Sequence, residues 1–200
     1  VRLVPKGKPN EELKAIRKEM LQLIEQQAQK GNIDLLYGDE VQFSERGYVP
    51  YAWQFADEKV FIEASRGASI NCFGLVSRSN HFRYKITDKS INADFIIEML
   101  DELSLDISNL TFVVLDNARV HTARKVKQLF EIWQQRGLYI FYLPPYSPHL
   151  NIIERLWKEF EQTWLKPSDY KTADDLFYAV NRICNAIGKY LFLNYSIPEF

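Results

Sequence analysis

The sequence is poor in cysteine and has no long apolar run. Its two cysteines, Cys72 and Cys184, lie far apart, and neither has a second cysteine or a spaced histidine pair nearby. This excludes a disulfide framework and a structural zinc site of the usual spacing. No apolar stretch reaches the roughly 18 residues that span a bilayer, and the first residues, VRLVPKGKPNEELK, contain no signal-peptide core. We therefore expect a soluble, cytoplasmic chain with reduced core cysteines and no membrane association.

Charge of one sign is not in excess either. The chain has 25 basic and 26 acidic residues and a formal net charge of −1. It has no general attraction to nucleic acid, so any DNA contact must come from local basic patches. A hydrophobic content of 46% over 200 residues allows one domain with a sizeable core and a small appendage. The chain begins with Val rather than Met, which we interpret as a sign of a fragment or of a longer reading frame.

The spacing of apolar residues predicts alternating helices and strands. Helices are predicted at 10–30, 91–103, 120–136, 150–164 and 172–191. Strands are predicted at 33–40, 59–65, 68–77, 110–116 and 138–143. The last two strands are reached through helices, so we expect them to run parallel to the first, whereas Arg66-Gly67 predicts a hairpin turn. This order predicts an α/β fold with a mixed five-stranded sheet and helices on both faces.

Particular residues mark the helix ends and faces. We expect the first helix to end at Gly31-Asn32, and the helices at 91–103 and 172–191 to be capped near Ser90 and by Thr172. The predicted apolar face of the first helix consists of Leu13, Ile16, Met20, Leu23 and Ile24.

Three carboxylates are predicted to converge at one edge of the sheet. Asp39 lies at the end of the first strand and Asp116 at the end of the fourth, and parallel strands place such residues at the same carboxyl edge. Glu154 lies early in a helix, beside its buried stripe, and can reach back over that edge. Three carboxylates repel one another unless a cation binds them, and Mg²⁺ prefers oxygen ligands. Two such ions can support phosphodiester cleavage and exchange.

Taken singly, these residues have ordinary interpretations. An Asp that closes a strand is often a turn former or a helix cap, and a Glu early in a helix usually complements the helix dipole. The surrounding sequence decides between these alternatives. The segments YGDEVQFS (37–44), LDNARVHTAR (115–124) and LPPYSPHLNIIERLWKEFE (143–161) resemble the DDE transposases of bacterial insertion sequences in the mariner superfamily. The last segment is similar to the family signature PPYSP-x-LNPIE-x-x-W, and 37 residues separate Asp116 from Glu154.

The resemblance implies a ribonuclease-H-like catalytic domain that cleaves and transfers DNA strands at transposon ends. It implies Asp39, Asp116 and Glu154 as the catalytic and metal-binding residues, with Mg²⁺, or Mn²⁺ as a substitute, and two ions. The expected partners are the terminal inverted repeats, target DNA and a second copy of the chain in the synaptic complex, with nucleoid association when DNA is bound. Ile152 stands where the family usually has Pro, and we expect little cost there because Pro is tolerated in a first helical turn and Ile adopts the same backbone.

The resemblance also suggests a division of the chain. We expect a linker helix over 1–32, the catalytic domain over 33–168 and a helical extension over 169–200. The family recognises transposon ends through an N-terminal helix-turn-helix region, which residues before 33 do not offer. We therefore expect the recognition half to be absent or encoded upstream.

Several nearby residues are candidates for DNA contact, each with an alternative. Asn117 could contact a phosphate or cap a helix, and His121 could contact the scissile phosphate or be structural. The other candidates are Arg119, Arg124 and Lys125 on a basic helix, and Tyr146 and Ser147, expected to be exposed in the proline-rich segment. Glu40 should point away from Asp39 because side chains alternate along a strand, so we leave it out of the metal site. Trp157, Phe160 and Trp164 are interpreted as core, and Trp53 stays undecided.

Two other functions remain open from the sequence. The first is a non-catalytic DNA-binding or assembly module derived from a transposase, which the presence of all three carboxylates disfavours. The second is a ribonuclease-H-like nuclease acting on RNA–DNA hybrids, which the PPYSP signature disfavours.

Overall fold

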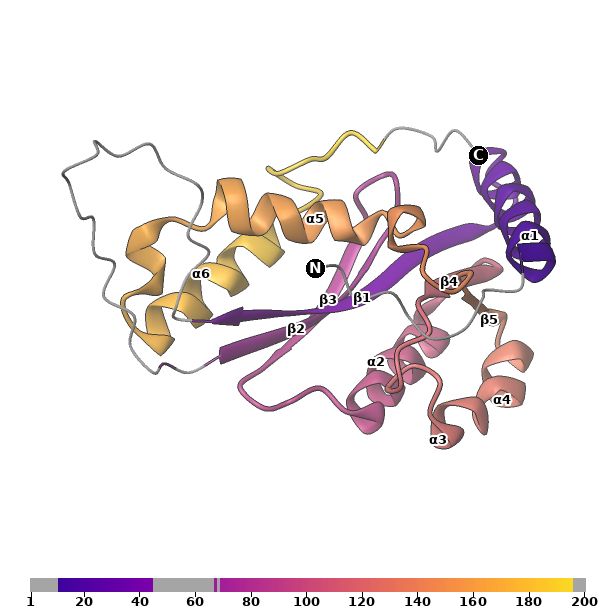
Figure 1. Ribbon diagram of the computed structural model, residues 1–200, viewed down its shortest axis with the longest axis horizontal. Coiled ribbons are helices and arrows are strands. Elements are labelled where there is room, and N and C mark those ends of the chain that lie inside the picture. Colours follow the sequence, from indigo (N-terminus) through magenta and orange to yellow (C-terminus); the bar gives the residue numbers. More distant parts are fainter. Residues whose placement is uncertain (1–10, 45–66, 68, 196–200) are drawn as a thin grey trace.

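The computed structural model describes residues 11–44, 67 and 69–195 and contains the predicted five-stranded mixed sheet (Figure 1). The strand order is β3-β2-β1-β4-β5. The antiparallel part pairs β1 with β2 and β2 with β3, and the parallel part pairs β1 with β4 and β4 with β5. The strands are β1 (Asp34–Ser44), β2 (Ser69–Val76), β3 (Phe82–Thr87), β4 (Thr111–Leu115) and β5 (Leu138–Tyr142).

The hairpin differs from the prediction. The predicted strand at 59–65 and the turn residue Arg66 lie outside the described residues, as does Trp53. The hairpin partner of β2 is instead β3, which the sequence analysis missed. Its six residues, FRYKIT, alternate between apolar and polar side chains, and all are partly or fully exposed at the sheet edge. The turn before β3 contains Asn80 at φ 63°, where its side-chain amide bonds the backbone of Leu193 at both N and O.

The five predicted helices are present with altered ends. They correspond to α1 (Glu11–Gln29), α2 (Ala93–Asp106), α3 (Arg124–Lys127) with α4 (Phe130–Gln135), α5 (Ile153–Glu159) and α6 (Ala173–Ala186). Short 3-10 turns, η1 (Pro148–Leu150) and η3 (Pro167–Tyr170), and a π turn, η2 (Phe160–Trp164), flank α5 and precede α6. Among the described helices, none is long and apolar enough to cross a membrane.

The helix ends differ in detail from the predicted ones. Asn92, not Ser90, caps α2, because its Oδ1 accepts from the N–H groups of Asp94 and Phe95. Thr172 caps α6 as predicted, but that helix ends at Ala186, ahead of Gly188 at φ 75°. The single helix predicted over 120–136 is divided into α3 and α4.

Two hydrophobic clusters cover the two faces of the sheet. Figure 1 shows α5 and α6 on one face and α2, α3 and α4 on the other. The first cluster joins α1, α5 and α6 to alternate residues of β1 and β2, including Tyr37 and Phe43. The second joins α2, α3 and α4 to Phe73 and Leu75, which point the other way from β2. Trp157 and Phe160 are buried in the first cluster and Trp164 packs against it, as predicted. Cys72 and Cys184 are free and buried.

The face that α1 turns to the sheet is not the predicted one. Leu13, Ile16, Met20 and Leu23 are 42–59% exposed, and of the predicted face only Ile24 packs against the core. The helix is instead buried at Leu21 and Glu25. A carboxylate therefore occupies the position where an amphipathic pattern predicts an apolar side chain.

Glu25 is buried because it has cationic and phenolic partners. Its carboxylate, 2% exposed, accepts hydrogen bonds from Arg78 Nε at 2.8 Å and Nη2 at 2.6 Å. The hydroxyl of Tyr37 donates to the same carboxylate, and burial together with the Glu25 charge raises the pKa of Tyr37 well above its ordinary value. This cluster joins α1 to β1 and to the turn between β2 and β3.

Gly74 allows α5 to lie close to β2. A Cβ on Gly74 would stand 2.7 Å from both Phe82 Cε2 and Trp157 Cη2, which are rigid ring atoms. We expect Gly74→Ala to lower the free energy of unfolding by about 1–3 kcal/mol, the usual cost of overpacking. Thermal unfolding followed by circular dichroism measures this loss. The control is Gly31→Ala, which is strained by φ 73° but has no neighbour within 4 Å of the added Cβ. A Tm for Gly74→Ala at or above that of the control would contradict the packing argument.

Candidate active site

Asp39 and Asp116 lie at the edge where the parallel part of the sheet ends. The parallel register pairs Tyr37 with Val114, so two further residues along each strand lead to Asp39 and Asp116. The predicted end of the first strand is wrong, since β1 continues to Ser44 by antiparallel pairing with β2, in which Asp39 faces Gly74. It is β4 that ends, at Leu115. The two carboxylates thus keep the predicted common edge.

Glu154 reaches this edge from the first turn of α5. Asn151, which lies two residues before the start of α5 and is 4% exposed, donates from Nδ2 to the carbonyl of Gly38 at 3.1 Å. This bond fixes the start of α5 beside Asp39, a role that sequence reasoning missed because it depends on a contact 113 residues away. Glu154 and Asp39 line one groove, and Glu154 and Asp116 line a second hollow beside it. The structure therefore brings all three predicted carboxylates into one region.

The carboxylates act on one another electrostatically. Burial, followed by the charges of Glu40, Glu154 and Asp116, raises the pKa of Asp39 to about 8. Burial and the charge of Asp116 also raise the pKa of Glu154. Asp116 differs: the hydrogen bond with His121 outweighs burial and lowers the pKa of this carboxyl. The region is thus rich in negative charge that repels itself.

His121 lies between two acidic residues instead of facing solvent. Its Nδ1 is 2.7 Å from Asp116 Oδ1 and its Nε2 is 2.9 Å from Glu40 Oε2. Burial lowers the pKa of the imidazole, but its interactions with Asp116 and Glu40 outweigh burial and raise it to about 9. His121 is fully buried, and its contact with the scissile phosphate stays a prediction. Glu40 does point away from Asp39, yet it meets the histidine that holds Asp116.

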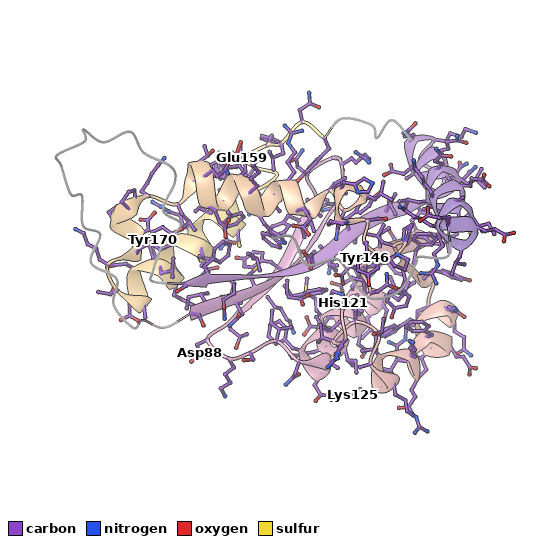
Figure 2. All side chains as sticks on the ribbon, viewed as in Figure 1. Asp88, His121, Lys125, Tyr146, Glu159 and Tyr170 are labelled. Carbon is purple, nitrogen blue, oxygen red and sulfur yellow. The ribbon has the colours of Figure 1, made fainter. Side chains whose placement is uncertain are left out.

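The remaining DNA-contact candidates divide into exposed and buried residues. Arg119, Arg124 and Lys125 are exposed, and Figure 2 shows Lys125 at the outer edge of the molecule, with His121 close to the sheet. Lys125 forms an ion pair with Asp94 at 2.5 Å. Tyr146 is 63% exposed as expected, at φ 57°.

Two of these predictions need correction. Ser147 is not exposed, because its hydroxyl turns inward and donates to the carbonyl of Pro145 at 3.3 Å. Asn117 does not cap a helix, since the next helix begins at Arg124. Its Nδ2 instead donates to the carbonyl of Leu143 at 2.7 Å.

The donor atoms at this edge suit a hard divalent cation. Within residues 11–44, 67 and 69–195, no three Asp, Glu, His or Cys side chains stand close enough together to hold an ion as they are. Mutual repulsion of carboxylates without a cation favours such a spread. Asp116 Oδ1 accepts from His121 and from the N–H of Ala118 at 2.9 Å, so among the described contacts Oδ2 is left for a ligand. A cation bound by Asp39, Asp116 and Glu154 would relieve the repulsion.

Without metal, rising pH should destabilise the fold. The pKa of His121, about 9, exceeds its unfolded value near 6.5, so the stability it contributes is complete below pH 6.5 and is lost as pH rises through 9. The raised pKa of Asp39 acts in the same direction between about pH 4 and 8. We expect urea unfolding in EDTA to show a lower stability at pH 9 than at pH 6, by a few kcal/mol at about 1.4 kcal/mol per pKa unit. Asp39→Asn should flatten part of this dependence, and a stability that increases with pH would contradict it.

Comparison with known proteins gives a family and a fold. A family model described as DDE superfamily endonuclease matches residues 34–177. An uncharacterized protein of Sinorhizobium fredii, y4pE/y4sA, is 30% identical over 86 residues, which cover 43% of this chain and 57% of that protein. The chain thus spans little more than half the length of this relative.

Solved structures of the Mos1 transposase share the architecture. The paired-end complex with left transposon end has a TM-score of 0.64 at 16% identity, covering 93% of this chain and 58% of that one. The mariner Mos1 paired end complex with Mg has a TM-score of 0.53 at 17% identity, covering 94% and 64% of the two chains. These likenesses show that the fold is ribonuclease-H-like, as predicted.

Proposed function

The chain belongs to the DDE superfamily endonucleases, and from that membership we propose that it is a transposase catalytic domain that cleaves and transfers DNA strands at transposon ends. The observation that carries the proposal is the convergence of Asp39, Asp116 and Glu154 at one sheet edge, where burial and their charges raise the pKa of Asp39 to about 8. A site of this kind needs a cation to hold all three groups ionised at neutral pH.

We propose that Asp39, Asp116 and Glu154 bind Mg²⁺, or Mn²⁺ in its place, as two ions. When bound, the metal lowers the pKa of an attacking water or hydroxyl and stabilises the leaving oxygen. Asp116 presents Oδ2 because His121 and Ala118 hold Oδ1. Glu154 is fixed by the bond between Asn151 and Gly38. The Mg complex of the structurally similar mariner Mos1 supports the choice of metal.

The proposed partner is DNA, bound outside the carboxylates. Asn117, Arg119, Arg124, Lys125 and Tyr146 are our candidates for contacts to the sugar–phosphate backbone, since Asn117 and Tyr146 line the hollow beside Asp116 and the cations are exposed on the adjacent segment. The Mos1 structures are described as complexes with transposon ends, which supports inverted repeats and target DNA as substrates, bound by two copies of the chain. The division into a linker over 1–32, a catalytic part over 33–168 and an extension over 169–200 also remains a proposal.

Cleavage of labelled DNA tests the function. The protein is incubated with Mg²⁺ and with DNA duplexes that carry or lack the transposon ends. We expect nicking at the ends followed by joining to a target duplex, and no reaction in EDTA. RNA–DNA hybrid in a parallel reaction tests the ribonuclease alternative: cleavage of the hybrid alone would refute the transposase function. DNA binding without any cleavage would favour the non-catalytic module.

A further inference from the structure

A buried histidine and two partly exposed carboxylates connect the two central strands beside the carboxylate site. Glu40 Oε2 lies 2.9 Å from His121 Nε2, and His121 Nδ1 lies 2.7 Å from Asp116 Oδ1. Glu40 belongs to β1 and Asp116 follows β4, so the imidazole spans from one strand to the end of the next. Both of its nitrogens contact carboxylates, which positions the ring between them.

The histidine is held from other directions as well. Its backbone N–H bonds the carbonyl of Ala118 at 3.1 Å, and its own carbonyl accepts from the hydroxyl of Tyr142 at 2.7 Å. The ring packs 5.8 Å from that of Phe73, and the whole side chain is 0% exposed. These contacts hold the imidazole ring between the two carboxylates.

The contacts of His121 lie beyond the last backbone pairing between β1 and β4. The parallel pairing between β1 and β4 ends at Tyr37 and Val114, so backbone hydrogen bonds of that ladder do not set the position of Asp116 relative to Asp39. Glu40 is the neighbour of Asp39 on the same strand. The contacts of His121 with Glu40 and Asp116 therefore link Asp116 to the residue next to Asp39. Asp39 and Asp116 are two of the three predicted metal ligands.

We propose that Glu40 is a positioning residue, which acts through His121 to hold Asp116 in the orientation that leaves Oδ2 directed to the metal. The inference rests on the proposed function and adds a residue to it. Groups that orient metal ligands without touching the ion typically change metal affinity 10–100-fold when they are removed. Glu40 should have an effect in this range despite pointing away from Asp39.

Titration with Mn²⁺, followed by calorimetry and by the electron paramagnetic resonance of free Mn²⁺, tests this without any DNA. We expect Glu40→Ala to weaken Mn²⁺ binding about tenfold, and Glu40→Gln, which keeps an oxygen acceptor for the imidazole, to weaken it less. The matched control is Glu161→Ala, because Glu161 lines the same groove as Asp39 but lies in η2, beyond the end of α5. We expect this control to change the affinity less than twofold. Circular dichroism spectra identical to wild type show that each variant is folded.

A double-mutant cycle separates positioning from direct binding. If Glu40 acts through His121, Glu40→Ala has no further effect on Mn²⁺ affinity in a His121→Ala background. An equal loss in both backgrounds would overturn the inference, because Glu40 would then bind the ion itself or act through its charge alone. Should His121→Ala fail to fold, the order Glu161→Ala, Glu40→Gln, Glu40→Ala in increasing loss decides, and equal losses for all three would overturn it.

The failure of this inference is distinct from failure of the proposed function. Wild-type affinity in Glu40→Ala, together with a loss in Asp116→Asn, would refute only the positioning role. Wild-type protein that binds no Mn²⁺, or Asp116→Asn that binds it as tightly as wild type, would refute the metal site itself.

Discussion

Asp116→Asn should lower the rate of DNA cleavage by at least about a hundred- to a thousandfold, the usual loss when one major electrostatic group is removed from an active site. The change keeps the size of the side chain and an oxygen that His121 and Ala118 can still bond, so the surrounding structure should persist. It removes the negative charge with which Oδ2 would bind a divalent ion. Single-turnover cleavage of an end-labelled duplex with Mg²⁺ measures the effect.

The control for this substitution is Asp106→Asn. Asp106 forms an ion pair with Arg83 at 2.9 Å, with the carboxylate side chain 62% exposed, and it ends a helix away from the site. The same loss of charge there should leave cleavage within about twofold of wild type, since exposed ion pairs contribute little. Cleavage by Asp116→Asn at the wild-type rate would show that the metal-site hypothesis is wrong.

Arg78→Ala should be strongly destabilising, lowering the free energy of unfolding by about 3–5 kcal/mol. The loss arises because Glu25, 2% exposed, would keep a buried charge without its guanidinium partner. Urea unfolding measures it. Combining Arg78→Ala with Glu25→Gln should recover part of the loss, because the double variant no longer buries a carboxylate at this position.

Arg83→Ala provides the matched comparison. Arg83 also pairs with a carboxylate, but the two side chains are 44% and 62% exposed, and we expect a loss of less than about 1 kcal/mol. Similar losses for the two arginine variants would mean that burial does not determine the strength of the Arg78 pair.

The parts of the fold that were predicted correctly are those that depend on residues close together in the sequence. The buried strands β4 and β5 and the cap at Thr172 follow from runs of apolar residues and a capping side chain. Strand β3 was missed although FRYKIT alternates between apolar and polar residues, because the turn predicted at Arg66-Gly67 placed the hairpin partner of β2 before it in the sequence. The face of α1 was wrong because a buried Glu25 becomes favourable only when Arg78, 53 residues away, is beside it.

The same distinction between local patterns and long-range contacts holds for the candidate site. Asp39, Asp116 and Glu154 were predicted because each lies in a recognisable sequence motif, and the structure places them in one region. The positions of Glu40, His121 and Asn151 depend on contacts between segments that are distant in the sequence. The alternation of side chains along β1 predicted that Glu40 points away from Asp39. It could not show that His121, from the loop after β4, lies beside Glu40.

The adjacency of Asp39 and Glu40 in β1 has a consequence for strand pairing. A slip of one residue in a β-ladder turns every side chain of the strand to the opposite face. In β1 such a slip would bury the wrong apolar residues. It would also reverse the faces of the two carboxylates, so that Asp39 lay on the side of His121 and Glu40 on the side of α5. Only one alignment of β1 with its neighbours packs both hydrophobic clusters and also places Asp39 near Glu154 and Glu40 beside His121. The correct register of the strand and the assembly of the active site are therefore selected together.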